Sequence, residues 1–498
     1  MNLGGISLDA YKDFAGGNYS GFGEASMDDV NALNKALSAG ELRGGAVEGQ
    51  INASGTPLKV ESLEKTLKVL TYKANNIVFW KDMPVLPAYN TVEEYNKQIS
   101  YGHDDIGAFT NEGELPEETD STFVRESQLV KYMGTVRQVT HQMTLVNTNI
   151  GDIVNKYSED GTLWILRQLE QHLFSGNSNL VSQQFKGFWV QQMEDFTSEI
   201  EWLDSDFVVD CRGYTLDQVY ANQASATIAI NFGFATDLYA SPQAMADFVD
   251  TFYPKQRLGV DIGKSRVGLE VTEFVSQNGP IDLKQDVFLQ PKPALTTAVA
   301  ATGAKAPAAP LADGVAPIAA VGATAANTKW DAGTAGDYLY AVRACNRYGK
   351  SAITVLSASP TTIVTNGAVD LKFTAGSGAF APTYFEILRS DEGATAGAST
   401  KYYHLFDISA TQLAAGYNGG AAGVVRDLNR YLPNTTKGLM IERTLEVLSF
   451  KQLAPLMKMD LARLGPAIRF MILLYGTPIL YAPRKIVTFI NIGSTIKT

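Results

Sequence analysis

The feature that most constrains the fold is an abrupt change of composition inside the chain. From residue 291 to about residue 326 the sequence is almost only Ala, Pro, Gly, Thr and Val. Short strand-like segments then alternate with turns as far as Pro433, without helical periodicity, which is typical of a small β-sandwich. Helix-like and strand-like segments mix on both sides, so residues 291–433 are predicted to be an insertion in an α+β host. The strands expected in it are 338–345, 352–357, 369–373, 384–389 and 401–406.

The host before the insertion begins with residues 1–60, which are rich in Gly, Asn, Ser and Ala and predict an N-terminal arm ordered by neighbouring copies. A short helix and an apolar strand at 77–80 are expected next. Residues 89–145 predict a long two-stranded excursion around an acidic turn. Apolar residues spaced by three and four over 149–176 predict an amphipathic helix that Gly176 ends, although Gly161 interrupts the pattern.

The remaining host segments, 201–290 and 434–498, mix both kinds of element. Ser241 and Pro242 indicate a helix start, with serine as N-cap and proline in the first turn. The other expected elements are strands at 227–232 and 268–275, a helical patch at 448–457, and strands at 469–474, 479–481 and 485–490.

Composition limits the classes of protein that this chain can belong to. With 45% hydrophobic and 19% charged residues it is predicted to fold, and its most apolar stretch, 470–482, is too short for a bilayer span of about 20 residues. Residues 1–10 lack a signal-peptide pattern. A net charge of -11 disfavours sequence-specific DNA binding. Cys211 and Cys345 fit neither a disulfide framework nor a zinc site.

Motifs that could carry chemistry fail on spacing. Residues 259–265 imitate a phosphate-binding loop, but one residue is missing between the glycines and a strand is expected to follow. His103, His141, His172 and His404 show no metal-binding spacing, and His172 is expected to be structural. The acidic run 112–120 is expected to be a solvated loop tip, and Asp204 and Asp206 call for the same interpretation. The sequence therefore predicts no catalytic, cofactor-binding or metal-binding residues, and a protein that is not an enzyme.

Several segments resemble one known family. Residues 169–177 with 184–188, residues 237–248, and residues 453–457 with 469–485 are similar to parts of tailed-phage major capsid proteins, whose HK97-like fold is shared with encapsulins. Residues 338–351 and 384–390 resemble strands of an immunoglobulin or fibronectin type III domain. The resemblance implies an HK97-like α+β fold with an inserted all-β sandwich.

The resemblance also implies a domain layout. Residues 61–200 would form the peripheral domain, including the extended hairpin called the E-loop (about 89–145) and the spine helix (about 149–176). Residues 201–290 would begin the axial domain. Residues 291–433 would be the immunoglobulin-like insertion, and residues 434–498 would return to the axial domain and complete the peripheral domain.

The function implied is that of a major capsid protein assembling into homo-hexamers and homo-pentamers of an icosahedral head around double-stranded DNA. Portal, scaffolding and decoration proteins are the expected partners, with no membrane and no cofactor. The location would be the virion shell, after assembly in the host cytoplasm. The arm and the hairpin are expected to lie over adjacent subunits, and the insertion to project outward and be dispensable for folding.

Two alternatives stay open. The first is a phage tail or surface adhesin protein whose sandwich binds carbohydrate. The second is a carbohydrate hydrolase, which would need two convergent carboxylates.

Overall fold

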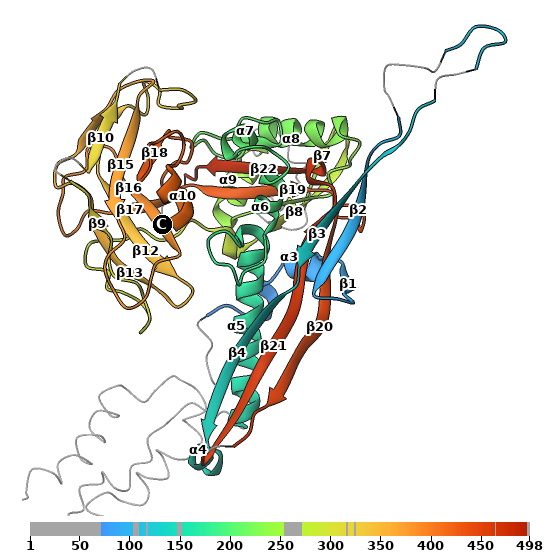
Figure 1. Cartoon of the computed structure of the whole chain (residues 1–498). Coiled ribbons are helices and arrows are strands. Elements are labelled where there is room, and N and C mark those ends of the chain that lie inside the picture. The colour runs from blue at the N-terminus through green and yellow to red at the C-terminus, as the bar shows by residue number, and fades with distance from the viewer. Residues whose placement is uncertain are drawn as a thin grey trace, which may run out of the picture. The chain divides into compact units, whose positions relative to one another are not determined.

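The computed structural model describes residues 71–102, 109–115, 118–146, 152–252, 271–314, 317–322, 325–463 and 465–495 (Figure 1). They fall within the unit Val69–Thr498. The predicted arm (1–60), the Gly-Lys-Ser segment (259–265) and His103 lie outside the described residues. Among the described helices, none is both long and apolar enough to cross a membrane.

The longest helix, α5 (Ile153–Ser175), confirms the amphipathic helix predicted before Gly176. Asp152 caps its first turn by accepting a hydrogen bond from the Val154 N–H at 2.9 Å. At the other end the Gly176 N–H donates to the carbonyl of His172. Both ends of the helix therefore satisfy part of their free backbone groups locally.

Gly161 lies within α5, at a point where the helix approaches a sheet closely. A Cβ at this position would lie 2.6 Å from Ile472 Cδ1 and about as close as contact allows to Arg137. The helix packs on β4 (Lys131–Thr140) and β21 (Ala467–Leu480), as Figure 1 shows. The glycine that interrupts the apolar pattern is thus explained by close packing and does not break the helix.

The sheet under α5 has the order β1-β20-β21-β4. Strand β1 (Val85–Pro87) runs parallel to β20 (Leu448–Asp460), which is antiparallel to β21. The helical patch predicted at 448–457 was wrong, because this segment is hydrogen-bonded along its length to β21 and in part to β1. The strands predicted at 469–474 and 479–481 form a single strand, β21.

The extended hairpin consists of β2 (Val92–Ser100) and β3 (Thr122–Leu129), paired antiparallel. The two-stranded pairing is shorter than the predicted excursion, because the chain changes sheets at Val130. Val130 is buried and its N–H donates to the carbonyl of Thr91 at 2.9 Å. Strand β4 then pairs with β21, and α4 (His141–Leu145) follows. Polar and apolar residues alternate on both sides of Val130, so the sequence pattern alone could not show where the chain passes from one sheet to the other.

Residues 77–80, predicted as a strand, lead into the short helix α3 (Phe79–Asp82). The backbone N–H groups of Val78, Phe79 and Trp80 all donate to the carboxylate of Glu170, at 2.8, 2.6 and 2.9 Å. Successive N–H groups can converge on one acceptor in a helical turn but not in an extended strand. Glu170 is 90 or more positions away in the sequence, so nothing near residues 77–80 predicted the turn.

A second sheet has the order β5-β22-β19-β6-β8-β7 and combines strands from before and after the insertion. Its strands are β5 (Val208–Asp210), β6 (Asp237–Ala240), β7 (Glu273–Ser276), β8 (Gly279–Gln285), β19 (Thr436–Ile441) and β22 (Ile486–Ile492). The remaining helical elements of the host are α6 (Phe188–Met193), α7 (Glu199–Leu203), α8 (Gln218–Ile230), α9 (Pro242–Phe252), η2 (Ala74–Asn76), η3 (Val287–Leu289) and η4 (Pro483–Lys485).

The strand predicted at 227–232 was wrong, since most of it is the end of α8. Ala221, Ala224 and Ile228 recur at helical spacing and are fully buried in one apolar cluster with residues of the second sheet. This packing outweighs the strand preference of the β-branched residues nearby. The helix start predicted at Pro242 is confirmed, and the Ser241 hydroxyl accepts from the Ala244 N–H at 3.3 Å. Of the strand predicted at 268–275, the described part forms β7 from Glu273.

The insertion contains two main sheets that share one apolar core. All five strands predicted in it from the sequence are present, with shifted ends. One sheet has the order β13-β12-β16-β17 and the other β10-β15-β18, with β9 beside β15 and a separate pair β11-β14. The elements are β9 (Leu311–Ala312), β10 (Ile318–Val321), β11 (Gly336–Tyr338), β12 (Tyr340–Asn346), β13 (Gly349–Val355), β14 (Thr361–Ile363), β15 (Ala368–Thr374), β16 (Tyr384–Ser390), β17 (Tyr402–Ser409), α10 (Ala410–Ala415) and β18 (Val424–Asp427).

A buried arginine lies inside this sandwich. Arg389, whose side chain is only 2% exposed, pairs with Asp427 at 3.0 Å and donates to Asn429 Oδ1 at 2.9 Å. Its guanidinium also lies over the rings of Trp330 and Tyr338. Pairing and stacking together compensate for the loss of water around the charge.

The insertion is joined to the host by polar contacts and by a common apolar cluster. Arg430 forms a bidentate pair with Asp204 at 2.8 and 2.9 Å. Tyr417 and Tyr431 both donate their hydroxyls to the carboxylate of Glu199 on α7. The core of the sandwich forms one cluster with four buried host residues, which are Trp202, Leu203, Val208 and Ile490. The α+β class predicted from the sequence is confirmed, and the insertion is closely packed on its host.

Candidate functional site

The most exposed apolar side chains of the described chain include several on the β2–β3 hairpin and its connecting segment. Phe109 is 99% and Leu115 93% exposed, and neither packs on the rest of the protein. We call this set the hairpin surface. Its members are Ile99, Tyr101, Phe109, Leu115 and Phe123. Isolated two-stranded hairpins are marginally stable in water, so an apolar hairpin of this kind is suited to packing against a partner.

The base of the hairpin is fixed to the body of the protein. The ring of Tyr95 packs edge-on against Tyr481, with centroids 5.1 Å apart. Burial raises the pKa of Tyr95, and its hydroxyl donates to Glu126 at 2.8 Å. The ammonium of Lys97 pairs with the same carboxylate at 2.7 Å. The anchoring groups lie at one end of the hairpin, whereas the exposed apolar groups lie toward its tip.

The acidic run 112–120 forms no carboxylate cluster among its described residues. Asn111 and Glu114 close a turn through the Glu114 N–H and the Asn111 side chain, at 3.1 and 2.8 Å. Glu112, Glu114, Glu118 and Asp120 are all exposed, which agrees with a solvated loop tip. Asp204 pairs with Arg430 and has a lowered pKa for that reason, and Asp206 is exposed.

Of the described histidines and cysteines, only His404 meets other potential ligands. His172 is tied to the Gln168 carbonyl and to Gln184, and burial lowers its pKa. His141 begins α4 and is exposed. Burial raises the pKa of Cys211 to about 12 and also raises that of Cys345, so neither thiol is an activated nucleophile.

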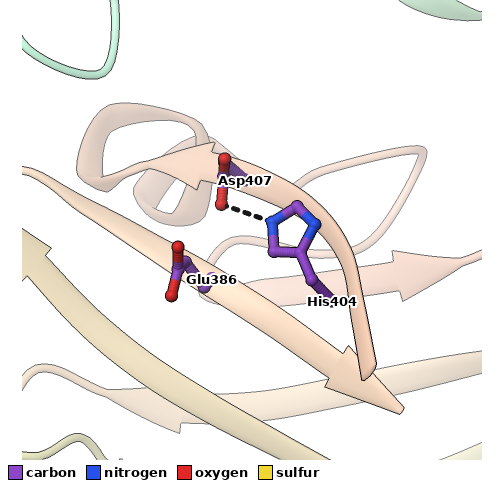
Figure 2. Close-up of side chains that lie close together, drawn as sticks. All are labelled: Glu386, His404 and Asp407. Carbon is purple, nitrogen blue, oxygen red and sulfur yellow. Dashed lines mark hydrogen bonds and ion pairs between the residues drawn. The ribbon is translucent and has the colours of Figure 1, made fainter. Parts of the chain in front are cut away.

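A polar cluster that sequence reasoning missed lies on the sheet β13-β12-β16-β17 of the insertion. Glu386 on β16 and His404 and Asp407 on β17 face one another (Figure 2), with potential ligand atoms within 4.8 Å of each other. Positions 404 and 407 would point to opposite faces of a regular strand. A bulge at Leu405 brings them to the same face, because Leu388 pairs with His404 and Ile387 with Phe406.

A lysine already supplies the cation in this cluster. The ammonium of Lys292 lies 3.1 Å from Glu386 Oε1, 2.9 Å from His404 Nε2 and 3.4 Å from Asp407 Oδ2. Lys350 approaches Glu386 at 2.7 Å. Burial alone would raise the pKa values of both carboxyls, but Lys292, together with His404 and Lys350, outweighs it and lowers them. The group therefore fits an ion-pair network better than a metal centre.

Removing the ammonium tests that interpretation. We expect Lys292→Ala to destabilise the insertion by about 1–2 kcal/mol, because buried Glu386 loses one of its two cations. We also expect added Zn²⁺ to raise the melting temperature of this variant and not that of the wild type, since one histidine and two carboxylates are suitable zinc ligands. Thermal unfolding with and without zinc measures both effects.

The matched control is Lys305→Ala. Lys305 is an exposed lysine that, like Lys292, precedes β9, and its ammonium lies over the ring of Tyr348. It should change neither stability nor the response to zinc. Zinc stabilisation of the wild-type protein to the same extent as the variant would contradict the ion-pair interpretation.

Comparison with known proteins finds similar sequences in phages. No family model matches the sequence. The major capsid protein of Staphylococcus phage K is 25% identical over 457 residues, which cover 88% of this chain and 90% of that protein. A second relative, from Enterococcus phage phiEF24C, is 24% identical over 470 residues, covering 92% and 94%. The chain is similar to phage major capsid proteins. The resemblance predicted from the sequence is confirmed.

Solved structures also align with this chain along most of its length. A chain from the capsid of a native GTA particle is 9% identical with a TM-score of 0.42, covering 89% of this chain and 99% of that one. The SrpI encapsulin of Synechococcus elongatus is 8% identical with a TM-score of 0.34, covering 87% and 94%. The immunoglobulin-like type of the insertion stays a prediction.

Proposed function

We propose that this capsid relative builds the shell of a phage head by self-assembly into hexamers and pentamers of an icosahedral lattice. The observation that carries the proposal is similarity to phage major capsid proteins over about nine tenths of both chains. Those relatives are named as structural proteins of the shell, which supports a capsid-forming and non-catalytic role. They do not favour the tail, adhesin or hydrolase alternatives.

The hairpin surface supports packing between copies. Its apolar side chains extend beyond what one protomer covers, and its base is anchored to the body. We propose that each hairpin lies over an adjacent subunit, where burial of apolar area would contribute about 25 cal/mol per Å². The arm, residues 1–60, is proposed to do the same.

The charge balance supports an enclosed but unspecific nucleic acid. The whole chain carries a net charge of -11, which disfavours tight binding to phosphates. We propose that double-stranded DNA is packed inside without sequence specificity, and that portal, scaffolding and decoration proteins are partners. Assembly would take place in the host cytoplasm, and the mature location would be the virion shell.

The insertion is proposed to be an immunoglobulin- or fibronectin-like sandwich exposed on the outside of the shell. Its 11 basic and 9 acidic residues make it nearly neutral, whereas the host is strongly acidic. A nearly neutral module would contribute little to the repulsion between an acidic shell and DNA. Decoration, adhesion to a host surface and shell stabilisation are the roles it could serve.

Electron microscopy with sedimentation velocity, on the chain expressed alone and with neighbouring genes, tests the proposed function. We expect closed shells or rings of capsomers. Small discrete oligomers under every condition would contradict the capsid proposal. Binding to a glycan panel would then favour the adhesin alternative.

Limited proteolysis tests the proposed packing of the hairpin. We expect cleavage between residues 100 and 122 in soluble protomers and protection in assembled particles, because only the partner would cover this segment. Mass spectrometry of the fragments locates the cuts. A hairpin equally resistant in both states would show that no partner is needed to order it.

A further inference from the structure

Two carboxyl groups lie together in the interior where α3, α5 and η3 meet. Glu170 on α5 and Asp286, the N-cap of η3, are both fully buried. Glu170 accepts the three backbone N–H groups of residues 78–80 described above. Asp286 Oδ1 accepts from the Phe288 N–H at 2.8 Å. Its other oxygen, Oδ2, has no donor among the described residues, and its carboxyl lies within hydrogen-bonding reach of Glu170.

No cation compensates this pair within the described part of the chain. Several ionisable side chains on the neighbouring elements are engaged elsewhere. These contacts are Arg167 with the Tyr72 ring, Lys81 with the Ala74 carbonyl, Asp82 and Asp237 with Lys284 and Arg443, Tyr239 with Asp82, His172 with Gln168 and Gln184, and Lys437 with the Trp189 and Tyr431 rings. Two adjacent buried carboxylates without a cation cannot both be ionised at low cost.

We infer that Glu170 and Asp286 share one proton and form a pH-sensitive latch that holds residues 78–80 on α5. Glu170 carries the negative charge, because three N–H donors stabilise a carboxylate. Asp286 carries the proton and donates its O–H to Glu170, which gives Oδ2 the partner it lacks. The segment held in this way connects residues 1–70 to the rest of the chain. The inference does not depend on the proposed function.

The pKa shifts agree with this arrangement. Burial raises the pKa of Asp286 to about 8, and the negative charge of Glu170 acts in the same direction. Burial also raises the pKa of Glu170, against the lowering effect of its three backbone donors. The folded protein thus keeps a proton that the unfolded chain releases near pH 4.

The sign of the pH dependence follows from this difference. The stabilising contribution of the Asp286 proton is complete below about pH 4 and is lost as the pH rises toward 8, by up to tenfold in the unfolding equilibrium constant per pH unit. Above about pH 8 Asp286 loses its proton in the folded protein too. Repulsion between the two carboxylates then weakens the hold on the N–H groups of residues 78–80.

Asp286→Asn tests the latch directly. The amide can donate to Glu170 through Nδ2 and accept from Phe288 through Oδ1, so it copies the protonated acid at every pH. We expect the variant and the wild type to be equally stable below about pH 4. The variant should then become progressively more stable, by up to tenfold in the unfolding equilibrium constant per pH unit to pH 8. Hydrogen exchange of peptides covering residues 77–82 should accelerate above pH 8 in the wild type relative to the variant.

The comparison uses full-length protein in one assembly state, as checked by sedimentation velocity. Asp152→Asn is the matched control, because Asp152 is an exposed N-cap that asparagine replaces well, so its profile should run parallel to the wild type. Parallel profiles for Asp286→Asn and the wild type from pH 5 to 9 would overturn the proposal.

A second variant keeps the test independent of that substitution. Glu170→Gln removes the charge that the three N–H groups hold, and we expect faster exchange of residues 77–82 at every pH. Unchanged exchange in this variant would show that Glu170 does not hold the segment, and the latch would be rejected.

Discussion

Replacing residues 92–129 by Asn-Gly is expected to leave a folded protomer that no longer forms shells. The Val130 N–H donates to the Thr91 carbonyl at 2.9 Å, so the two cut ends are already paired and a two-residue turn can join them. The body loses only the edge contact between Tyr95 and Tyr481 and a few neighbours. Assembly loses the whole hairpin surface, which we propose covers a neighbouring copy.

Thermal unfolding and sedimentation velocity separate these two effects. The melting temperature should stay within a few degrees of the wild type, as expected for a loss of about 1 kcal/mol. Phe123→Asp is a second variant with a smaller change. It keeps the hairpin and places one charge on the hairpin surface. Normal shells from the shortened chain would show that the hairpin does not contribute to assembly.

Deleting residues 291–433 is expected to give an insoluble host, which differs from the outcome anticipated from the sequence. The sequence suggests a dispensable outer module, but the structure shows a shared apolar cluster containing Trp202, Leu203, Val208 and Ile490. Each apolar side chain that loses its cover costs about 1.5–3 kcal/mol. Glu199 and Asp204 also lose their partners in the insertion.

A repaired deletion distinguishes this explanation from a general failure to fold. Combining the deletion with Trp202→Gln and Leu203→Lys should restore part of the soluble yield, because the uncovered surface becomes polar. Soluble yield and circular dichroism are the measurements. A soluble, stable host from the simple deletion would mean that the junction contributes little.

Elements whose local pattern and tertiary packing agree could be predicted from the sequence. Helix α5 repeats apolar residues at helical spacing and ends at Gly176, and the strands of the insertion alternate or are continuously apolar. The failures lie where distant partners decide. Strand β20 is fixed by pairing with β21, and α3 by Glu170. In α8 burial against the second sheet outweighs the preference of β-branched residues.

The candidate sites show the same division. The exposed acidic turn near Glu114 and the tied His172 could be anticipated from local sequence. The polar cluster could not, because Glu386 lies on another strand and the spacing of His404 and Asp407 predicts opposite faces. The pair of Glu170 and Asp286 joins residues far apart in the chain, and neither has a local signal. The one hint in the sequence is the position of Glu170 on the buried side of an amphipathic helix, where a carboxylate needs a partner.

The bulge at Leu405 has a consequence for tracing this cluster through evolution. Leu405 and Phe406 both enter the same core, so the extra residue adds an apolar side chain without altering the pairing of His404 with Leu388. A homologue lacking that residue would keep the imidazole and the carboxylate on the same face, now separated by one position. Searches for the cluster in distant genomes should therefore accept both His-x-Asp and His-x-x-Asp and place the alignment gap at Leu405.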